Sequence, residues 1–132
     1  MRLVLLHPAI LLVLGALATL TSASSAKCSR WKDGIPIIKN FVIPMYRRYS
    51  IEVSGMEEGE DVPELCGTLW KELKQFKGSC VVSVDNPKCE ANGPTALQWS
   101  FSVGLGCNKG MVHAAWWDST KNRLGKIKCE NV

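Results

Sequence analysis

The sequence predicts an α+β domain, in which one amphipathic helix packs on an antiparallel sheet of about four or five strands. Three observations predict this fold. Apolar residues recur at three- and four-residue steps within residues 61–78, which is typical of a helix. They alternate with polar residues within residues 97–107, which is typical of a strand. Six Cys in a short chain indicate a small domain stapled by disulfides.

Residues 1–26 have the pattern of a secretory signal peptide. One basic residue precedes a long apolar run, and small residues follow it from Thr21 to Ala26. Cleavage after Ala26 is the expected position, and Ala23 and Ser25 are alternatives that also place small side chains near the cut. A transmembrane anchor would need about 20 apolar residues, and Pro8 interrupts the run. We therefore expect a secreted, extracellular protein without a membrane span.

Residues 27–132 are expected to form a single disulfide-rich globular domain. This part of the chain has about 106 residues, which suits one domain. Without Arg2 it carries 15 basic and 12 acidic residues, a net charge of +3. Such a small charge does not indicate binding to nucleic acid. The charge is nevertheless uneven, because an acidic segment at residues 52–64 lies between basic flanks that include Lys32, Arg47 and Arg48.

All six cysteines fall in the predicted mature domain, namely Cys28, Cys66, Cys80, Cys89, Cys107 and Cys129. An even number favours complete pairing into three disulfides, for which 15 arrangements exist. Bridges such as Cys107–Cys129 or Cys28–Cys66 would each contribute roughly 2–4 kcal/mol. Zinc sites use Cys or His pairs at a spacing of two to four residues. A zinc site is not expected, because the closest cysteines here, Cys80 and Cys89, have eight residues between them.

The first half of the domain contains two predicted extended segments and the helix. Residues 35–44 are apolar and bracketed by prolines, which favours an edge strand or an extended packed segment. Apolar residues alternate with polar ones over 48–54, which predicts a strand with one solvated face. Asp61 and Glu64 have the spacing of a helix N-terminal cap, and Gly78 marks the end of the helix. Cys66 lies on its apolar stripe.

The second half of the domain is predicted to be all β. A short strand over Cys80–Val84 ends at turn residues Asp85–Lys88. A longer strand covers Leu97–Cys107, and Asn108–Gly110 has the composition of a hairpin loop. Met111–Trp117 is then the expected return strand, and Leu124–Cys129 a last short strand.

The sequence offers little for catalysis. His113 is the one histidine outside the leader, so any histidine-dependent hydrolase would have to use it. The acidic residues Glu57, Glu58 and Glu60 lie on a predicted solvated loop, where a raised pKa suitable for a catalytic acid is not expected. The loop also lacks the residue pattern of an EF-hand calcium site. We therefore expect no catalytic residues, no cofactor and no metal.

Aromatic and charged residues are better candidates for a binding surface. Trp116 and Trp117 are neighbours, so in a strand one would face the core and the other solvent. An exposed Trp is a frequent binding hot spot. The predicted binding residues are these two tryptophans, the acidic loop and a basic segment: Trp116, Trp117, Glu57, Glu58, Glu60, Arg47 and Arg48. Tyr46 and Trp31 would add aromatic surface beside the two arginines.

The spacing of the last four cysteines is similar to that of the two consecutive disulfides of cystatin-type protease inhibitors. That likeness covers about 50 residues and implies the pairs Cys80–Cys89 and Cys107–Cys129. The Gln-x-Val-x-Gly loop and the Pro-Trp hairpin of these inhibitors are absent. No inhibitory residue is therefore carried over to this chain.

These observations favour a secreted, non-enzymatic effector that binds an extracellular protein. Venom or salivary effectors, toxins among them, and immune-modulating ligands are built in this way, and we expect a monomer. The alternative is a small protease inhibitor that presents a disulfide-braced loop, either Asp85–Lys88 or Asn108–Gly110. A small hydrolase that uses His113 is the third hypothesis.

Overall fold

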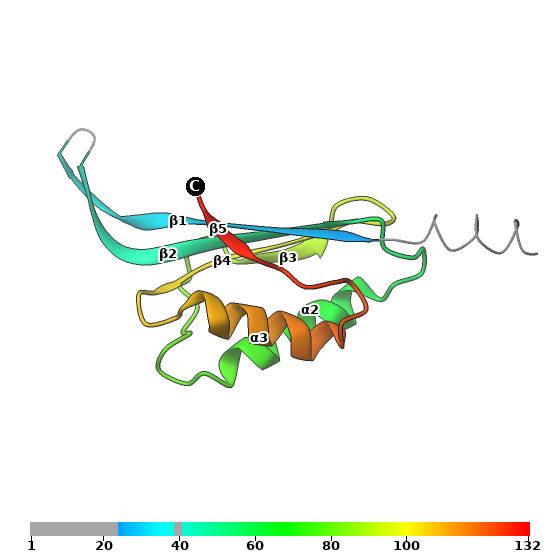
Figure 1. The fold of residues 1–132 in the computed structure, drawn as a ribbon. Coiled ribbons are helices and arrows are strands. Elements are labelled where there is room, and N and C mark those ends of the chain that lie inside the picture. Colours follow the sequence, from blue (N-terminus) through cyan, green and yellow to red (C-terminus); the bar gives the residue numbers. More distant parts are fainter. Residues whose placement is uncertain (1–23, 39–40) are drawn as a thin grey trace, which may run out of the picture.

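The computed structural model describes residues 24–38 and 41–132 and has two helices on one face of a five-stranded sheet (Figure 1). The elements in chain order are β1 (Ser25–Ile38), β2 (Phe41–Ser54), α2 (Val62–Lys74), β3 (Lys88–Ala91), β4 (Leu97–Gly104), α3 (Lys109–Thr120) and β5 (Cys129–Asn131). The strand order is β3-β4-β2-β1-β5. The predicted small α+β domain with a disulfide-stapled sheet is confirmed, with a second helix and one parallel strand pair added.

The core lies between the sheet and the two helices. Alternate residues of the central strands point toward the helices, and their cross-strand partners are also apolar: Tyr49 opposes Phe101, and Ile51 opposes Trp99. These four side chains are fully buried. The opposite face of the sheet is lined mainly by polar residues of the same strands. The alternation in the sequence thus predicted which face of β2 and β4 is buried.

Helix α2 forms as its sequence indicates. The side chain of Asp61 accepts a hydrogen bond from the backbone N–H of Glu64 at 3.1 Å and thereby caps the first turn. Leu65, Leu69 and Leu73 follow at four-residue steps and are buried against the sheet. The helix ends at Lys74, four residues before the predicted terminator Gly78.

The predicted return strand over Met111–Trp117 is wrong, because these residues lie in helix α3. The predicted hairpin loop at Asn108–Gly110 is wrong for the same reason. Asn108 is the N-cap, and its side chain accepts a hydrogen bond from the N–H of Met111 at 3.0 Å. The buried residues Val112, Ala115, Trp116 and Ser119 follow helical spacing. Because apolar residues also occupy the other positions of this run, the helical period was hidden.

Of the two short strands predicted in the second half of the chain, one does not form and the other starts later than predicted. Residues 80–84 make one isolated bridge, between Val82 and Val103, rather than a strand. The last strand starts only at Cys129 and runs parallel to β1. The sequence predicted an antiparallel sheet, but β5 and β1 form a parallel pair. After α3 the chain returns along the sheet before β5 pairs with β1, and β5 therefore runs in the same direction as β1.

Three disulfides use all six cysteines: Cys28–Cys129, Cys66–Cys89 and Cys80–Cys107. Complete pairing is confirmed, but the example bridges Cys28–Cys66 and Cys107–Cys129 and the cystatin-type pair Cys80–Cys89 are not formed. Cys28 lies directly opposite Cys129 in the parallel pair β1–β5, so these two are the nearest partners. Cys66, which lies on the buried stripe of α2, joins this helix to the edge strand β3. Among the described residues, no helix is long and apolar enough to cross a membrane.

Candidate binding surface at the base of a β arm

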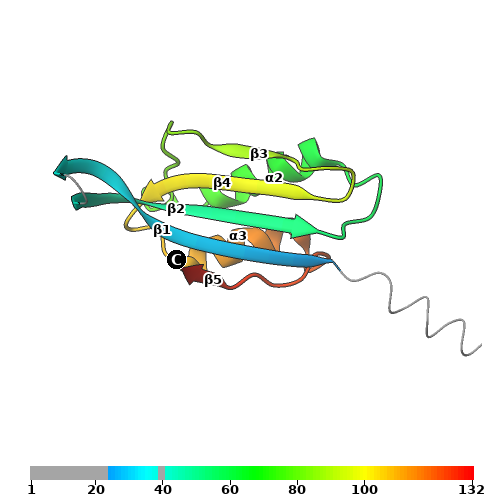
Figure 2. The same ribbon diagram turned by 90° about the horizontal axis from the view of Figure 1, so that it is seen from above.

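The two longest strands extend beyond the rest of the sheet as a two-stranded arm. Pairing of β4 with β2 ends at Tyr46, and pairing of β5 with β1 ends at Arg30. From Gly34 to Ile38 and from Phe41 to Pro44, the two strands pair only with each other within the described part of the chain. Figure 2 shows this arm projecting from one end of the sheet. The apolar segment 35–44 lies in it; residues 39 and 40 are outside the described residues.

Two cations face each other where the arm leaves the sheet. Lys32 of β1 lies directly opposite Arg47 of β2. Both cations lie on the face of the sheet that the helices cover. Arg47 pairs with Val103 of β4, whose side chain is buried on that face, and Lys32 pairs with Arg47. Among the described residues, the one ion pair is Arg123–Glu60, so neither cation has a carboxylate partner there. Like charges directly across an antiparallel pair are destabilising.

Exposed apolar side chains surround the same place. Met45 is 47% exposed, Tyr46 40% and Leu105 53%. Met45 stands at an irregularity of the register, where Asp33 pairs with Tyr46 and Gly34 with Pro44. We call residues 31–33, 45–48 and Leu105 the arm base. It combines two cations that form no ion pair with a described residue, Lys32 and Arg47, with exposed apolar and aromatic surface. Its one carboxylate, Asp33, accepts a hydrogen bond from the hydroxyl of Ser102 at 2.9 Å.

The side chain of Arg48, one of the predicted binding residues, forms hydrogen bonds within the protein. Its guanidinium donates to the carbonyls of Asp85 at 3.0 Å and Asn86 at 2.8 Å. It also donates to the hydroxyls of Ser100 at 3.1 Å and Ser102 at 3.2 Å. Arg48 therefore fastens the loop before β3 to the outer face of the sheet. Arg47, the other predicted arginine, faces the opposite side and makes no such contacts among the described residues.

Of the two predicted tryptophans, one is buried in the core and the other is exposed, as predicted. They lie on helix α3, however, and not on the predicted strand. Trp116 is fully buried, and its indole N–H donates to the carbonyl of Gly125 at 2.9 Å. Trp117 is 42% exposed, and the ammonium of Lys126 lies 5.7 Å from its ring centre. A shallow pocket of about 290 Å³ adjoins Trp117 and is also lined by His113. Trp117 therefore remains a candidate contact, whereas Trp116 is a core residue.

The side chain of His113 forms a hydrogen bond with the last strand, β5. Its Nε2 accepts a hydrogen bond from the backbone N–H of Cys129 at 3.0 Å. Burial lowers the pKa of His113, and the nearby charge of Lys109 lowers it further. The imidazole is thus neutral at pH 7, and its acceptor nitrogen is already used. The residues that line its pocket include no carboxylate.

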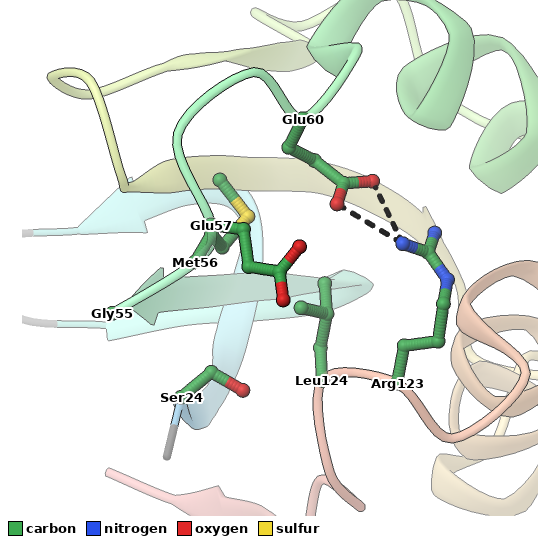
Figure 3. A pocket seen from close by; sticks show the side chains of 7 residues that line it. All are labelled: Ser24, Gly55, Met56, Glu57, Glu60, Arg123 and Leu124. Carbon is green, nitrogen blue, oxygen red and sulfur yellow. Dashed lines mark hydrogen bonds and ion pairs between the residues drawn. The ribbon is translucent and has the colours of Figure 1, made fainter. Parts of the chain in front are cut away.

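The acidic loop lies at the other end of the sheet, beyond the end of β2. Glu60 and Arg123 form an ion pair there, in which Arg123 Nη1 lies 3.1 Å and 3.0 Å from the two carboxylate oxygens. The pair forms one wall of a pocket of about 300 Å³, whose other lining residues include Glu57 but not Glu58 (Figure 3). Met56 and Leu124 line it as buried apolar residues. The predicted acidic residues therefore differ in role, and only Glu57 and Glu60 share a pocket.

The structure brings together residues that the sequence did not connect. Arg47 was singled out, but Lys32 only as part of a basic flank, and Met45 and Leu105 not at all. Cross-strand pairing joins Lys32 to Arg47, and the register shift between Asp33 and Gly34 leaves Met45 without a partner in β1. Leu105 follows Gly104, which pairs with Tyr46. Among the described residues, no group of three potential metal ligands occurs. Comparisons with protein-family models, curated proteins and solved structures found no match.

Proposed function

We propose that this protein is a secreted, non-enzymatic effector that binds an acidic extracellular protein through its arm base. The observation that carries the proposal is the pair Lys32–Arg47, two cations that lie directly opposite each other and form no ion pair with any described residue. A local arrangement that costs stability is most often kept at a functional site. A carboxylate-rich partner surface would turn this repulsion into attraction.

The surroundings of the two cations suit a protein partner. Interfaces are enriched in aromatic residues, Met and Arg, and depleted in Lys and acidic residues. Met45, Tyr46 and Arg47 lie side by side in the sequence at the arm base and are partly or largely exposed. Charge complementarity would guide the encounter, and the apolar side chains would supply buried area. The extracellular setting is supported by the three disulfides.

The hydrolase hypothesis receives less support from the geometry. A general base must accept a proton, and Nε2 of His113 already accepts the N–H of Cys129. Asp118, a carboxylate on the same helix as His113, accepts a hydrogen bond at 3.4 Å from the exposed amide of Gln75, the residue that follows α2. These contacts suit a structural role for His113 in fixing β5.

One observation favours the alternative, a protease inhibitor. Val84 is 97% exposed at the tip of the loop between Cys80 and Cys89, which are both disulfide-bonded. Arg48 holds the carbonyls that follow, so the loop is braced. However, the N–H of Asn86 donates to the carbonyl of Val84 at 2.9 Å. An inhibitor of serine proteases must offer that carbonyl to the oxyanion hole of the enzyme, so the arm base is the better-supported contact.

Affinity capture from the fluid into which the protein is secreted tests the proposal. The bait is the mature protein, and the matched variants are Arg47→Glu and Lys88→Glu. Lys88 is an exposed cation on the edge strand β3, which β4 separates from β2, and its variant makes the same change of charge. We expect one acidic protein to be retained by the native bait and by Lys88→Glu, and lost with Arg47→Glu. Equal retention by both variants would contradict the proposal.

The same experiment separates the other contacts. Trp117→Ala removes the exposed tryptophan, and Val84→Asp introduces a charge at the tip of the braced loop. If Trp117→Ala or Val84→Asp abolishes capture and Arg47→Glu does not, the binding surface lies elsewhere. Capture of a protease that is lost only with Val84→Asp would support the inhibitor instead.

A further inference from the structure

Ser24, the residue before β1, lines the pocket at the acidic end of the molecule. It shares this pocket of about 300 Å³ with Glu57, Glu60 and Arg123. In Figure 3 the carboxylate of Glu57 lies next to Leu124, and Ser24 lies below it in this view. Ser24 thus lines the same pocket as an acidic side chain.

The carboxylates of this pocket outnumber its cations. Glu60 is paired with Arg123, whose Nη1 lies 3.0 Å from Oε2. Glu57 forms no ion pair with any described residue. The pocket therefore holds one carboxylate without a counter-charge, lined by the apolar residues Met56 and Leu124. A single additional cation would balance it.

The strand β1 begins at Ser25 and pairs with β2 from its first residue. Ser25 lies opposite Ser54, and Ala26 lies opposite Val53. Ala26 is partly buried against the core, next to the buried Val53. Cleavage after Ala26, the position expected from the sequence, would remove both pairs from the end of β1. Cleavage after Ala23 would keep them.

We propose that the leader is removed between Ala23 and Ser24, and that the new α-ammonium group of Ser24 lies in the pocket as the counter-charge of Glu57. Thr21 and Ala23 provide the small residues that cleavage requires three positions and one position before the cut. Water is the co-reactant: the Ala23–Ser24 peptide bond breaks, the carbonyl of Ala23 becomes a carboxylate, and the nitrogen of Ser24 is protonated to the ammonium. This proposal rests on the proposed secretion.

Expression of the full-length chain in cultured secretory cells tests the site of cleavage. The intact mass and the N-terminal sequence are measured for the protein recovered from the medium. We expect a chain that begins at Ser24. A secreted chain that begins at Ser25, Ala26 or Lys27 would overturn this inference and leave secretion standing. An uncleaved chain retained in the cells would overturn secretion itself.

Two leader variants sharpen this test. Thr21→Leu places a large side chain three positions before the proposed cut, and Ser22→Leu places the same side chain one position later, where size is not restricted. We expect Thr21→Leu to abolish the product that starts at Ser24 and Ser22→Leu to leave it unchanged. Identical products from both variants would contradict the proposed cut.

The ion pair is tested on the mature protein by thermal unfolding. Glu57→Gln is compared with Glu58→Gln, which makes the same change next to the pocket, in chains that start at Ser24 or carry one added Ala before it. We expect Glu57→Gln to lower the Tm by about 2–4 °C only in the chain that starts at Ser24. An equal effect of Glu57→Gln in both chains, or no effect in either, would overturn the placement of the ammonium group.

Discussion

Lys32 and Arg47 occupy directly opposed positions on β1 and β2, where the arm leaves the sheet. The next pair toward the arm, Asp33 and Tyr46, lies on the other face of the ribbon. The repulsion between the two cations therefore acts on one face alone. The arrangement has a consequence for stability that can be measured without knowing the partner.

We predict that Lys32→Glu stabilises the isolated protein. The change replaces a like-charged cross-strand pair by an opposite-charged one, which is worth about 0.2–1 kcal/mol in the free energy of unfolding. Urea unfolding of the native and variant proteins measures it, with Lys88→Glu as control. A variant that is less stable than the native protein would show that Lys32 has a favourable role within the fold.

The two large buried tryptophans are predicted to respond differently to replacement by Phe. The indole N–H of Trp116 donates to Gly125, whereas that of Trp99 has no acceptor among the described residues. Trp116→Phe therefore loses a hydrogen bond of about 1 kcal/mol in addition to packing, and Trp99→Phe removes an unpaired buried donor. Denaturant unfolding should show the larger loss for Trp116→Phe, and the reverse order would contradict the hydrogen-bond assignment.

Stability is predicted to depend on the charge of His113. Its pKa in the folded protein is lowered, chiefly by burial and then by Lys109, so the folded state favours the neutral ring. The contribution is fully present above the ordinary histidine pKa of about 6.5 and is lost as the pH falls through the lower folded value. Unfolding midpoints measured between pH 8 and 5 should therefore fall more for the native protein than for His113→Gln. Parallel curves would exclude this role.

The disulfides are predicted to differ in their contribution. Cys28–Cys129 closes a loop of 101 residues, and Cys66–Cys89 one of 23. In the chain-entropy description, the longer loop contributes about 4–5 kcal/mol and the shorter about 3–3.5 kcal/mol. Paired Cys→Ser replacements should therefore destabilise the protein more at 28 and 129 than at 66 and 89. Equal losses in equilibrium unfolding would show that local structure outweighs loop length.

Local patterns predicted the parts of this fold that one segment alone determines. Helix α2 was predicted because Asp61, Leu65 and Leu69 carry a cap and a clean helical stripe. Helix α3 was missed because Ala114 and Trp117 fill positions between its buried residues, and the cap at Asn108 was interpreted as a turn. The disulfide pairing could not be predicted because it depends on how β5 meets β1 in three dimensions.

The candidate site depends even more on tertiary structure. Arg47 and Arg48 are adjacent in the sequence and were predicted to act together, but the alternation of a strand places them on opposite faces. Arg48 fastens a loop, whereas Arg47 faces Lys32 across the ribbon. Their difference follows from the register between β1, β2 and β4, which no single segment contains.

Affinity measurement with the Lys32→Glu variant tests the central claim most directly. Once a partner has been captured, its dissociation constant is determined for the native protein, Lys32→Glu and Lys88→Glu at low and physiological salt. We expect Lys32→Glu to bind at least about tenfold more weakly while it unfolds at higher urea concentration, and Lys88→Glu to bind as the native protein does. Unchanged or tighter binding by Lys32→Glu would contradict an acidic partner at the arm base.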